Sequence, residues 1–208
     1  RRAIVIPDAV TVSTFHLADS KEACRKRLGL PIDKKIALYT GHLYEWKGAH
    51  VLAKASRDFQ TDELAVFVGG TESDITSFVK KNKDNCQSVV VGHRPYHEIP
   101  YYLKAADVAV LPNSGMEAIS RFYTSPMKLF EYMASGTPIV ASDLPSIREI
   151  LKPEMAIFVP SDNPSELLRG IRVIFNDPQK GVDLAGKAMS SVVNFSWENR
   201  AKAIERIL

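Results

Sequence analysis

The chain has 208 residues, of which 45% are hydrophobic, 25% charged and 9% aromatic. These proportions are ordinary for a globular protein and exclude a disordered, collagen-like or coiled-coil chain. The formal net charge of +3 is too small for a dedicated nucleic-acid-binding protein.

Short β-branched runs alternate with amphipathic stretches along the whole chain, a pattern typical of a parallel sheet covered by helices. In chain order, the predicted strands are 3–6, 36–40, 64–68, 89–91, 108–111, 138–141 and 156–159. The predicted helices are 19–28, 48–59, 72–82, 97–105, 126–135, 146–151, 163–175, 178–192 and 196–208, and 112–125 is predicted to be a long loop.

Strands with helices between them predict an α/β fold, namely a doubly wound, Rossmann-like parallel sheet with helices on both faces. No boundary has the composition of a flexible linker, so residues 1–208 are predicted to form a single domain. Ligands of such folds bind beyond the carboxyl ends of the strands, and the loops that follow the strands are therefore the candidate sites.

The loop after the strand 36–40 contains a candidate anion site. Gly41 at the strand end lets a ligand approach the backbone, and Lys47 precedes the next helix. Its ammonium group and the helix N-terminus would both face a bound anion. The alternative is a solvated lysine beside the glycine that starts a helix.

A second candidate site lies at the start of the helix 126–135. Pro126 suits a first helical turn, and the free N–H groups at Ser125, Met127 and Lys128 form a ready site for phosphate oxygens. Glu131 is one turn deeper, where its carboxylate would accept the two hydroxyls of a ribose. The alternative is an ordinary helix whose lysine and glutamate are solvated.

Other common site patterns are missing from the sequence. There is no G-x-G-x-x-G fingerprint and no Walker loop, and the surroundings of Ser114 do not match a nucleophile elbow. Cys24 and Cys86 lack metal-ligand spacing, and His93 and His97 have no obvious third ligand, so no metal site is predicted. Two unpaired thiols predict a cytoplasmic chain. No apolar run approaches the ~20 residues of a membrane span, so no transmembrane segment is predicted.

Several motifs together resemble the C-terminal half of the retaining group 1 glycosyltransferases, and the resemblance covers the chain from about Ile4. The specific motif is Ser-Pro-Met-Lys-Leu-Phe-Glu-Tyr-Met-Ala-Ser-Gly-Thr-Pro-Ile-Val-Ala-Ser at 125–142. Weaker ones are Gly-x-Leu-x-x-x-Lys-Gly at 41–48, Phe-Val-Gly-Gly at 67–70, Gly92, Ala-Asp-Val-Ala-Val-Leu-Pro at 106–112 and Phe-Ser-Trp at 195–197. The resemblance implies one half of a GT-B fold, in which the C-terminal domain binds a nucleotide-sugar donor.

The resemblance also implies roles for three candidate catalytic residues. Lys47 matches the lysine that neutralises the donor diphosphate, whereas His42 stands where the family usually has an arginine. Glu131 matches the second of two family glutamates, the one that holds the ribose. The first glutamate falls at Tyr123 in this sequence, and Glu117 is a candidate substitute.

The remaining donor-binding residues follow from the same motifs. The base is expected against the segment 93–95, and the candidate donor-binding residues are Gly41, Arg94, Ser125, Pro126, Met127 and Lys128. The implied substrate is a UDP- or GDP-sugar, transferred with retention of configuration and without a metal or other cofactor.

The resemblance finally implies a longer parent enzyme. The chain begins without Met inside an apolar run, which fits a piece of such a protein. The acceptor, a glycan or a lipid-linked molecule, would bind through the N-terminal domain, with the parent at the inner face of a membrane. Alternatives are a GT-B relative such as a sugar-nucleotide epimerase, or a non-catalytic donor-binding module.

Overall fold

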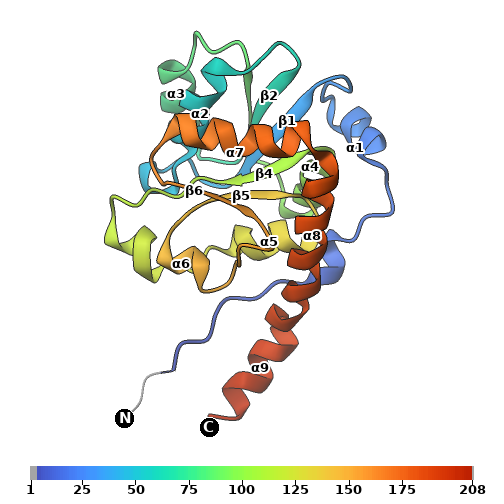
Figure 1. Ribbon diagram of the computed structural model, residues 1–208, viewed down its shortest axis with the longest axis vertical. Helices are drawn as coiled ribbons and strands as arrows, with labels where there is room; N and C mark the ends of the chain where they lie inside the picture. Colours follow the sequence, from blue (N-terminus) through green and yellow to red (C-terminus); the bar gives the residue numbers. More distant parts are fainter. Residues whose placement is uncertain (1–3, 208) are drawn as a thin grey trace.

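The fold is built on one six-stranded parallel sheet, seen in a computed structural model that describes residues 4–207 (Figure 1). Its strands are β1 (Lys35–Thr40), β2 (Glu63–Val68), β3 (Ser88–Gly92), β4 (Val108–Leu111), β5 (Ile139–Ser142) and β6 (Ile157–Val159). The strand order is β3-β2-β1-β4-β5-β6, so the direction of winding reverses between β1 and β4. This order is that of a doubly wound Rossmann-like sheet and confirms the predicted fold class.

Nine α-helices precede, connect or follow the strands within residues 4–207. They are α1 (Lys21–Leu28), α2 (Ala49–Ala55), α3 (Glu72–Lys81), α4 (Ile99–Ala105), α5 (Met127–Ser135), α6 (Pro145–Arg148), α7 (Pro164–Asn176), α8 (Pro178–Val192) and α9 (Trp197–Glu205). Local sequence fixes several ends. The Ser20 hydroxyl accepts from the N–H of Ala23 at the start of α1, and Gly29 ends it with φ 65°.

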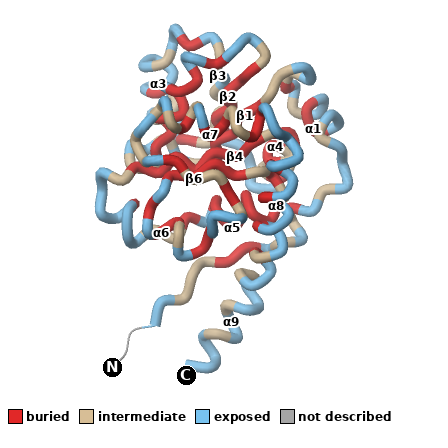
Figure 2. Tube along the Cα trace, viewed as in Figure 1, coloured by how far each residue is buried: buried red, intermediate tan, exposed pale blue. Residues whose placement is uncertain are grey.

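Each face of the sheet packs against its own helices, and Figure 2 shows the strands buried between the two layers. On one face, α2, α3 and α7 cover alternate strand residues such as Tyr39 and Phe67. On the other face, α1, α4, α5 and α6 cover Leu38, Val66 and their neighbours, together with much of α8. Burial on both faces explains why the strands appear in the sequence as continuous apolar runs rather than as alternating ones.

Some predicted elements differ from the structure. Ala3 lies outside the described residues, and 4–6 form no strand, since Ile4 and Val5 are exposed. The predicted helix 48–59 is α2 followed by a 3₁₀ turn, and Gly48 is the N-cap of α2 rather than part of it. The predicted loop 112–125 contains a π-helical turn at Ile119–Tyr123, and Pro126 is the N-cap of α5 instead of its first residue.

The N-terminal segment runs beside α9 instead of joining the sheet (Figure 1). Val10 forms an isolated parallel bridge with Ser196, and its N–H donates to the carbonyl of Phe195. The Arg200 guanidinium of α9 donates to the carbonyl of Pro7 and pairs with Asp8 at 3.3 Å. These contacts hold the segment against α9 and the turn before it, away from the sheet.

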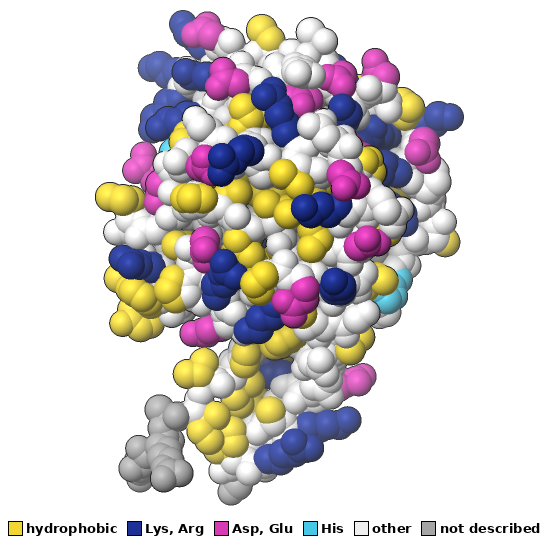
Figure 3. All heavy atoms as spheres, in the orientation of Figure 1, with side chains coloured by type: hydrophobic (Ala, Val, Ile, Leu, Met, Phe, Trp, Pro, Cys, Tyr) yellow, Lys and Arg dark blue, Asp and Glu magenta, His cyan; other side chains and the backbone are white. Residues whose placement is uncertain are grey.

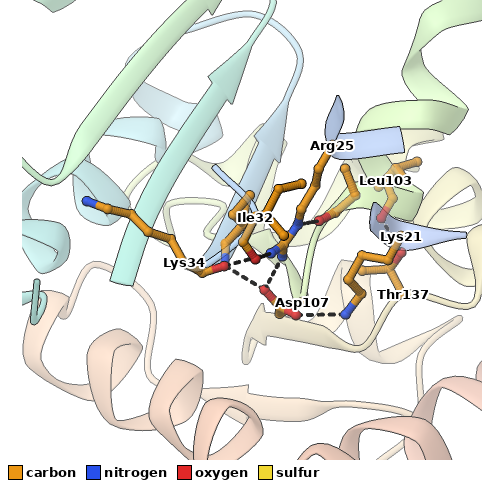
Figure 4. Close-up of polar contacts among 9 residues, drawn as sticks. Lys21, Arg25, Ile32, Lys34, Leu103, Asp107 and Thr137 are labelled. Atoms are coloured by element: carbon orange, nitrogen blue, oxygen red, sulfur yellow. Dashed lines mark hydrogen bonds and ion pairs between the residues drawn. The ribbon is translucent and has the colours of Figure 1, made fainter. Parts of the chain in front are cut away.

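An ion-pair network around the buried Arg25 lies at the amino end of the sheet (Figure 4). Arg25 of α1 is 4% exposed, and its guanidinium donates to the carbonyls of Ile32, Lys34 and Ala105 at 2.8–3.0 Å. It also donates to Asp107 at 2.6 Å, and this carboxylate accepts from the backbone N–H of Ile36 at 2.7 Å. The network ties α1 and the start of β1 to the start of β4, at the end of the sheet opposite to the loops that follow the strands.

Removing the carboxylate from this network is expected to destabilise the fold. In Asp107→Ala the buried Arg25 guanidinium loses its only carboxylate within the described residues, and the Ile36 N–H loses its acceptor. We expect a loss of about 2–3 kcal/mol of unfolding free energy, measured by urea denaturation. The control is Asp143→Ala, which removes an exposed pair with Arg148 and should cost less than about 1 kcal/mol. Equal effects of the two changes would contradict this prediction.

Figure 3 shows charged and apolar side chains mixed over the surface. An apolar group lies at the left, where Figure 1, in the same orientation, draws the segment that precedes α5. In that segment Met116, Ile119, Phe122 and Tyr123 are 46–84% exposed. Between residues 4 and 207, no helix has both the length and the apolar character that crossing a membrane requires. Cys24 is buried and Cys86 is exposed, and neither thiol is in a disulfide.

Candidate functional site

A pocket of about 500 Å³ lies at the carboxyl ends of β1, β2 and β4, beside the start of α5. It sits where the winding of the sheet reverses between β1 and β4, the usual ligand position in doubly wound folds. The three candidate catalytic and six candidate donor-binding residues all line this pocket: Gly41, His42, Lys47, Arg94, Ser125, Pro126, Met127, Lys128 and Glu131.

The loop after β1 brings a lysine and a histidine to the pocket. Gly41 has φ 115°, and a Cβ there would contact the Lys128 side chain at 3.4 Å, so glycine keeps the backbone and the ammonium close. Lys47 ends a 3₁₀ turn, and burial lowers the pKa of its ammonium. His42 is exposed, and its ring stacks on that of Tyr44 at 4.9 Å.

The start of α5 presents backbone donors to the same pocket. Pro126 is the N-cap, and its carbonyl accepts from the N–H of Leu129 at 2.8 Å. The N–H groups of Met127 and Lys128 belong to the first turn, where the helix itself supplies no acceptor. The Ser125 hydroxyl accepts from the N–H of Asp8, so the N-terminal segment is held against the pocket.

Lys128 is a buried cation without a hydrogen-bond acceptor in the described part of the chain. The residue is 9% exposed, and its Nζ lies 3.9 Å from the centre of the Tyr39 ring. Burial and the neighbouring Lys47 hold the pKa of this ammonium well below its usual range, with Glu131 acting in the opposite direction. A buried ammonium without an acceptor is unfavourable, so this pocket is suited to a ligand that brings negative charge.

Glu131 lies one turn further along α5, largely withdrawn from solvent. Burial raises the pKa of its carboxyl, while Lys128 and a hydrogen bond from the Tyr96 hydroxyl lower it. Burial and the nearby Glu131 raise the pKa of Tyr96 to about 12. Tyr96 could not be predicted from the sequence, because no local sequence pattern shows that the turn after β3 lies beside a carboxylate of α5.

Other residues that line the pocket were not selected from the sequence. They are Asp8, Thr40, Trp46, Val68, Gly69, Gly70, Ile99, Asn113 and Thr124, whereas His93, which also lines the pocket, belongs to the segment 93–95 expected against the base. The sequence signal for two of these residues is the Gly-Gly pair at 69–70. A Cβ on Gly69 would lie 2.5 Å from the Gly41 carbonyl oxygen, so only glycine fits there. Glu117, the candidate substitute for the missing glutamate, is exposed and is not among the residues that line the pocket. Tyr123 is 79% exposed.

A family comparison decides the assignment. The model of the family described as "Glycosyl transferases group 1" matches residues 20–191. The chain belongs to the group 1 glycosyltransferases. The matched range includes β1 to β6 and every pocket residue selected from the sequence.

The relatives that the chain matches in sequence are longer than the chain. A Bacillus subtilis protein with a provisional assignment as a glycosyltransferase of teichuronic acid biosynthesis (TuaC) is 30% identical over 170 residues. The match covers 80% of this chain and 40% of that protein. The chain thus spans about half the length, or less, of the relatives that it matches.

Solved structures with the same fold are GT-B glycosyltransferases. Sucrose-phosphate synthase from Thermosynechococcus elongatus superposes with a TM-score of 0.81 at 25% identity, covering 97% of this chain and 51% of the enzyme. HepE from Anabaena, solved in complex with UDP-glucose, gives a TM-score of 0.81 at 19% identity, covering 96% of this chain and 55% of HepE. This group 1 glycosyltransferase chain therefore has one Rossmann-like unit of the GT-B fold.

Proposed function

We propose that the chain is the C-terminal, donor-binding half of a retaining glycosyltransferase and that its pocket binds a nucleotide diphospho-sugar. The observation that carries the proposal is the buried Lys128 ammonium, which has no acceptor in the described part of the chain and lies beside Lys47 and Glu131. The UDP-glucose bound to HepE, which has the same fold, supports a donor of this class.

The diphosphate would lie between the loop after β1 and the start of α5. Lys47 and Lys128 supply two positive charges, and the first turn of α5 supplies backbone N–H donors. A bound diphosphate gives the Lys128 ammonium the acceptor that it lacks. It also relieves the repulsion between the two lysines.

The nucleoside would lie on the β3 side of the pocket. There the Glu131 carboxylate is suited to accept hydrogen bonds from the two ribose hydroxyls, with Tyr96 fixing its orientation. Arg94 and the backbone of the segment 93–95 would contact the base. His42 takes the position of the family arginine at the mouth of the pocket.

In the proposed transfer step the acceptor hydroxyl oxygen bonds to the anomeric carbon on the face from which the diphosphate departs, the bond between that carbon and the diphosphate oxygen breaks, and the hydroxyl proton passes to the departing diphosphate. Negative charge then develops on the diphosphate, where the two lysines and the helix N-terminus stabilise it. We propose that the configuration is retained and that these protein cations take the place of a metal ion. NMR of the product anomer and assays with added EDTA check the two points, and inversion or loss of activity with EDTA would contradict them.

The acceptor would bind to the half of the parent that precedes this chain, which spans about half the length of its relatives. We propose a glycan or a lipid-linked acceptor at the inner face of a membrane. Transfer by the full-length parent separates this proposal from an epimerase or a non-catalytic module, neither of which would glycosylate an acceptor.

Binding of UDP and GDP by the 208-residue chain tests the proposed donor site. We expect weak but measurable binding of one of them by calorimetry, and a loss of about tenfold in Glu131→Gln because a neutral amide accepts hydroxyl donors less well than a carboxylate. The variant should also lose the preference for the nucleotide over its 2′-deoxy form. Glu205→Gln, an exposed change at the end of α9, is the control. No binding of either nucleotide at millimolar concentration would contradict the proposal.

Donor affinity is expected to pass through a maximum as the pH is varied. Binding needs an ionised Glu131, whose pKa is raised, so affinity falls as the pH drops through that value. Binding also needs a charged Lys128, whose pKa is lowered, so affinity falls again as the pH rises through it. UDP-glucose is the better probe, because its diphosphate diester has no proton to lose in this range. Calorimetry from pH 5 to 10 checks the profile, and a flat profile would contradict it.

A further inference from the structure

Asn113 is a second buried polar residue of the pocket that has no partner among residues 4–207. The residue is 2% exposed, and its Oδ1 atom is buried without a hydrogen-bond donor. The residue lines the same pocket as Lys47 and Lys128. Buried amide groups are nearly always hydrogen-bonded, so one at the wall of a ligand pocket indicates a group that the ligand satisfies.

The backbone around Asn113 is held on both sides. The N–H of Ser114 donates to the carbonyl of Trp46 at 3.0 Å, and the N–H of Gly115 donates to Asp162 at 2.8 Å. On the preceding side, a Cβ on Gly48 would lie 1.7 Å from the carbonyl oxygen of Pro112, which shows how closely the two loops pack. The backbone that carries the Asn113 side chain is therefore held in position before any ligand arrives.

The strand order places Asn113 away from the nucleoside. Arg94 follows β3 and Asn113 follows β4, and β2 and β1 lie between these two strands. At the usual spacing of neighbouring strands, the ends of β3 and β4 are about 14 Å apart. Gly41, after β1, and the lysines lie between them. A donor with its base near Arg94 and its diphosphate at the lysines would thus extend its sugar toward Asn113.

We infer that Asn113 recognises a hydroxyl group of the donor's sugar, and this inference rests on the proposed function. A phosphate oxygen cannot satisfy the buried Oδ1, because both are hydrogen-bond acceptors. A sugar hydroxyl donates to Oδ1 and can also accept from the Nδ2 group, so it matches the amide whichever way the side chain is turned. Asn113 thereby contributes to the choice of sugar and not to nucleotide affinity.

Calorimetry on the 208-residue chain tests the inference. Each sugar nucleotide is compared with its bare nucleotide, using UDP-glucose, UDP-galactose and UDP, and GDP-mannose and GDP. In Asn113→Ala we expect the bare nucleotide to bind within twofold of the original chain. The sugar nucleotide that the original chain prefers should bind about tenfold more weakly, and its preference over the other sugar should shrink. Asn194→Ala, an exposed change after α8, is the matched control.

Thermal unfolding separates recognition from a structural role. The Asn113 amide makes no hydrogen bond to any described residue, so its removal should not lower the unfolding midpoint, whereas a structural amide would. Equal weakening of bare and sugar nucleotides, an unchanged affinity for all of them, or a clear fall in the midpoint would each overturn the inference. Failure of the original chain to bind any nucleotide would instead reject the proposed function.

Discussion

Replacing Lys47 by alanine is expected to lower kcat/KM for glycosyl transfer by the full-length parent about 10²–10³-fold, the usual cost of losing one group that stabilises transition-state charge. Lys47 is partly buried, and it lies near the second cation, Lys128. Its charge therefore acts on the diphosphate through a medium that screens it less than water does.

The loss should fall mainly on kcat. In the ground state the diphosphate is esterified at both ends, to the nucleoside and to the sugar. Additional negative charge develops on it only as the bond to the sugar breaks. Removing an interaction that is stronger in the transition state than in the ground state lowers kcat. Removing one that is equally strong in both states raises KM instead. We therefore expect UDP affinity to fall less than kcat, and Lys47→Arg to restore part of the rate.

Lys54→Ala is the matched control for this experiment. Lys54 is an exposed lysine of α2 that does not line the donor pocket. Its removal changes the net charge by the same amount and should leave the rate within twofold. Similar losses in the two variants would mean that Lys47 acts through the overall charge of the chain, and an unchanged rate in Lys47→Ala would remove it from the mechanism.

The fold and most of the pocket could be predicted because their determinants are local. The residues that line the pocket in 41–48 and 125–131 directly follow a strand or start a helix, and a Rossmann-like sheet brings such positions together whatever the rest of the sequence is. Glycine positions also carry local information. Gly69, at positive φ, approaches the Gly41 carbonyl too closely for any other residue to take its place.

The features that could not be predicted depend on contacts between distant parts of the chain. Asp8 reaches the pocket because the N-terminal segment is held by Arg200, nearly the whole chain away. Tyr96 lies beside Glu131 of another element, and Asn113 is buried where loops distant in the sequence pack together, which no spacing reveals. No strand forms at 4–6 for the same reason: β-branched composition favours a strand but does not show whether a partner strand lies beside it.

Lys128 shows the limit of sequence reasoning most clearly. A lysine at the start of a helix is usually exposed, and the sequence allowed both a phosphate ligand and a solvated cation. Burial excludes the solvated alternative, and it arises from the packing of α5 against the Tyr39 ring and the loop after β1. The sequence contains each of these parts but not their distances.

The final prediction is that Lys128→Met weakens donor binding while stabilising the chain. Methionine fills a similar volume without a charge, so the variant no longer buries an ammonium that lacks an acceptor. We expect a gain of about 1–2 kcal/mol of unfolding free energy in urea and a loss of about 100-fold in UDP affinity by calorimetry. Lys187→Met, an exposed change on α8, should alter neither quantity appreciably.

The pH dependence of this gain identifies its cause. The pKa of Lys128 is lower in the folded chain than in the unfolded one, so between the two values the unfolded state binds more protons and stability rises with pH. The stability advantage of Lys128→Met should therefore be greatest at low pH and shrink as the pH rises toward the ordinary lysine value of 10.5. A variant that is less stable than the original chain at every pH would show that Lys128 stabilises the fold. A stability advantage together with lost binding shows that the fold tolerates an unfavourable charge because the donor needs it.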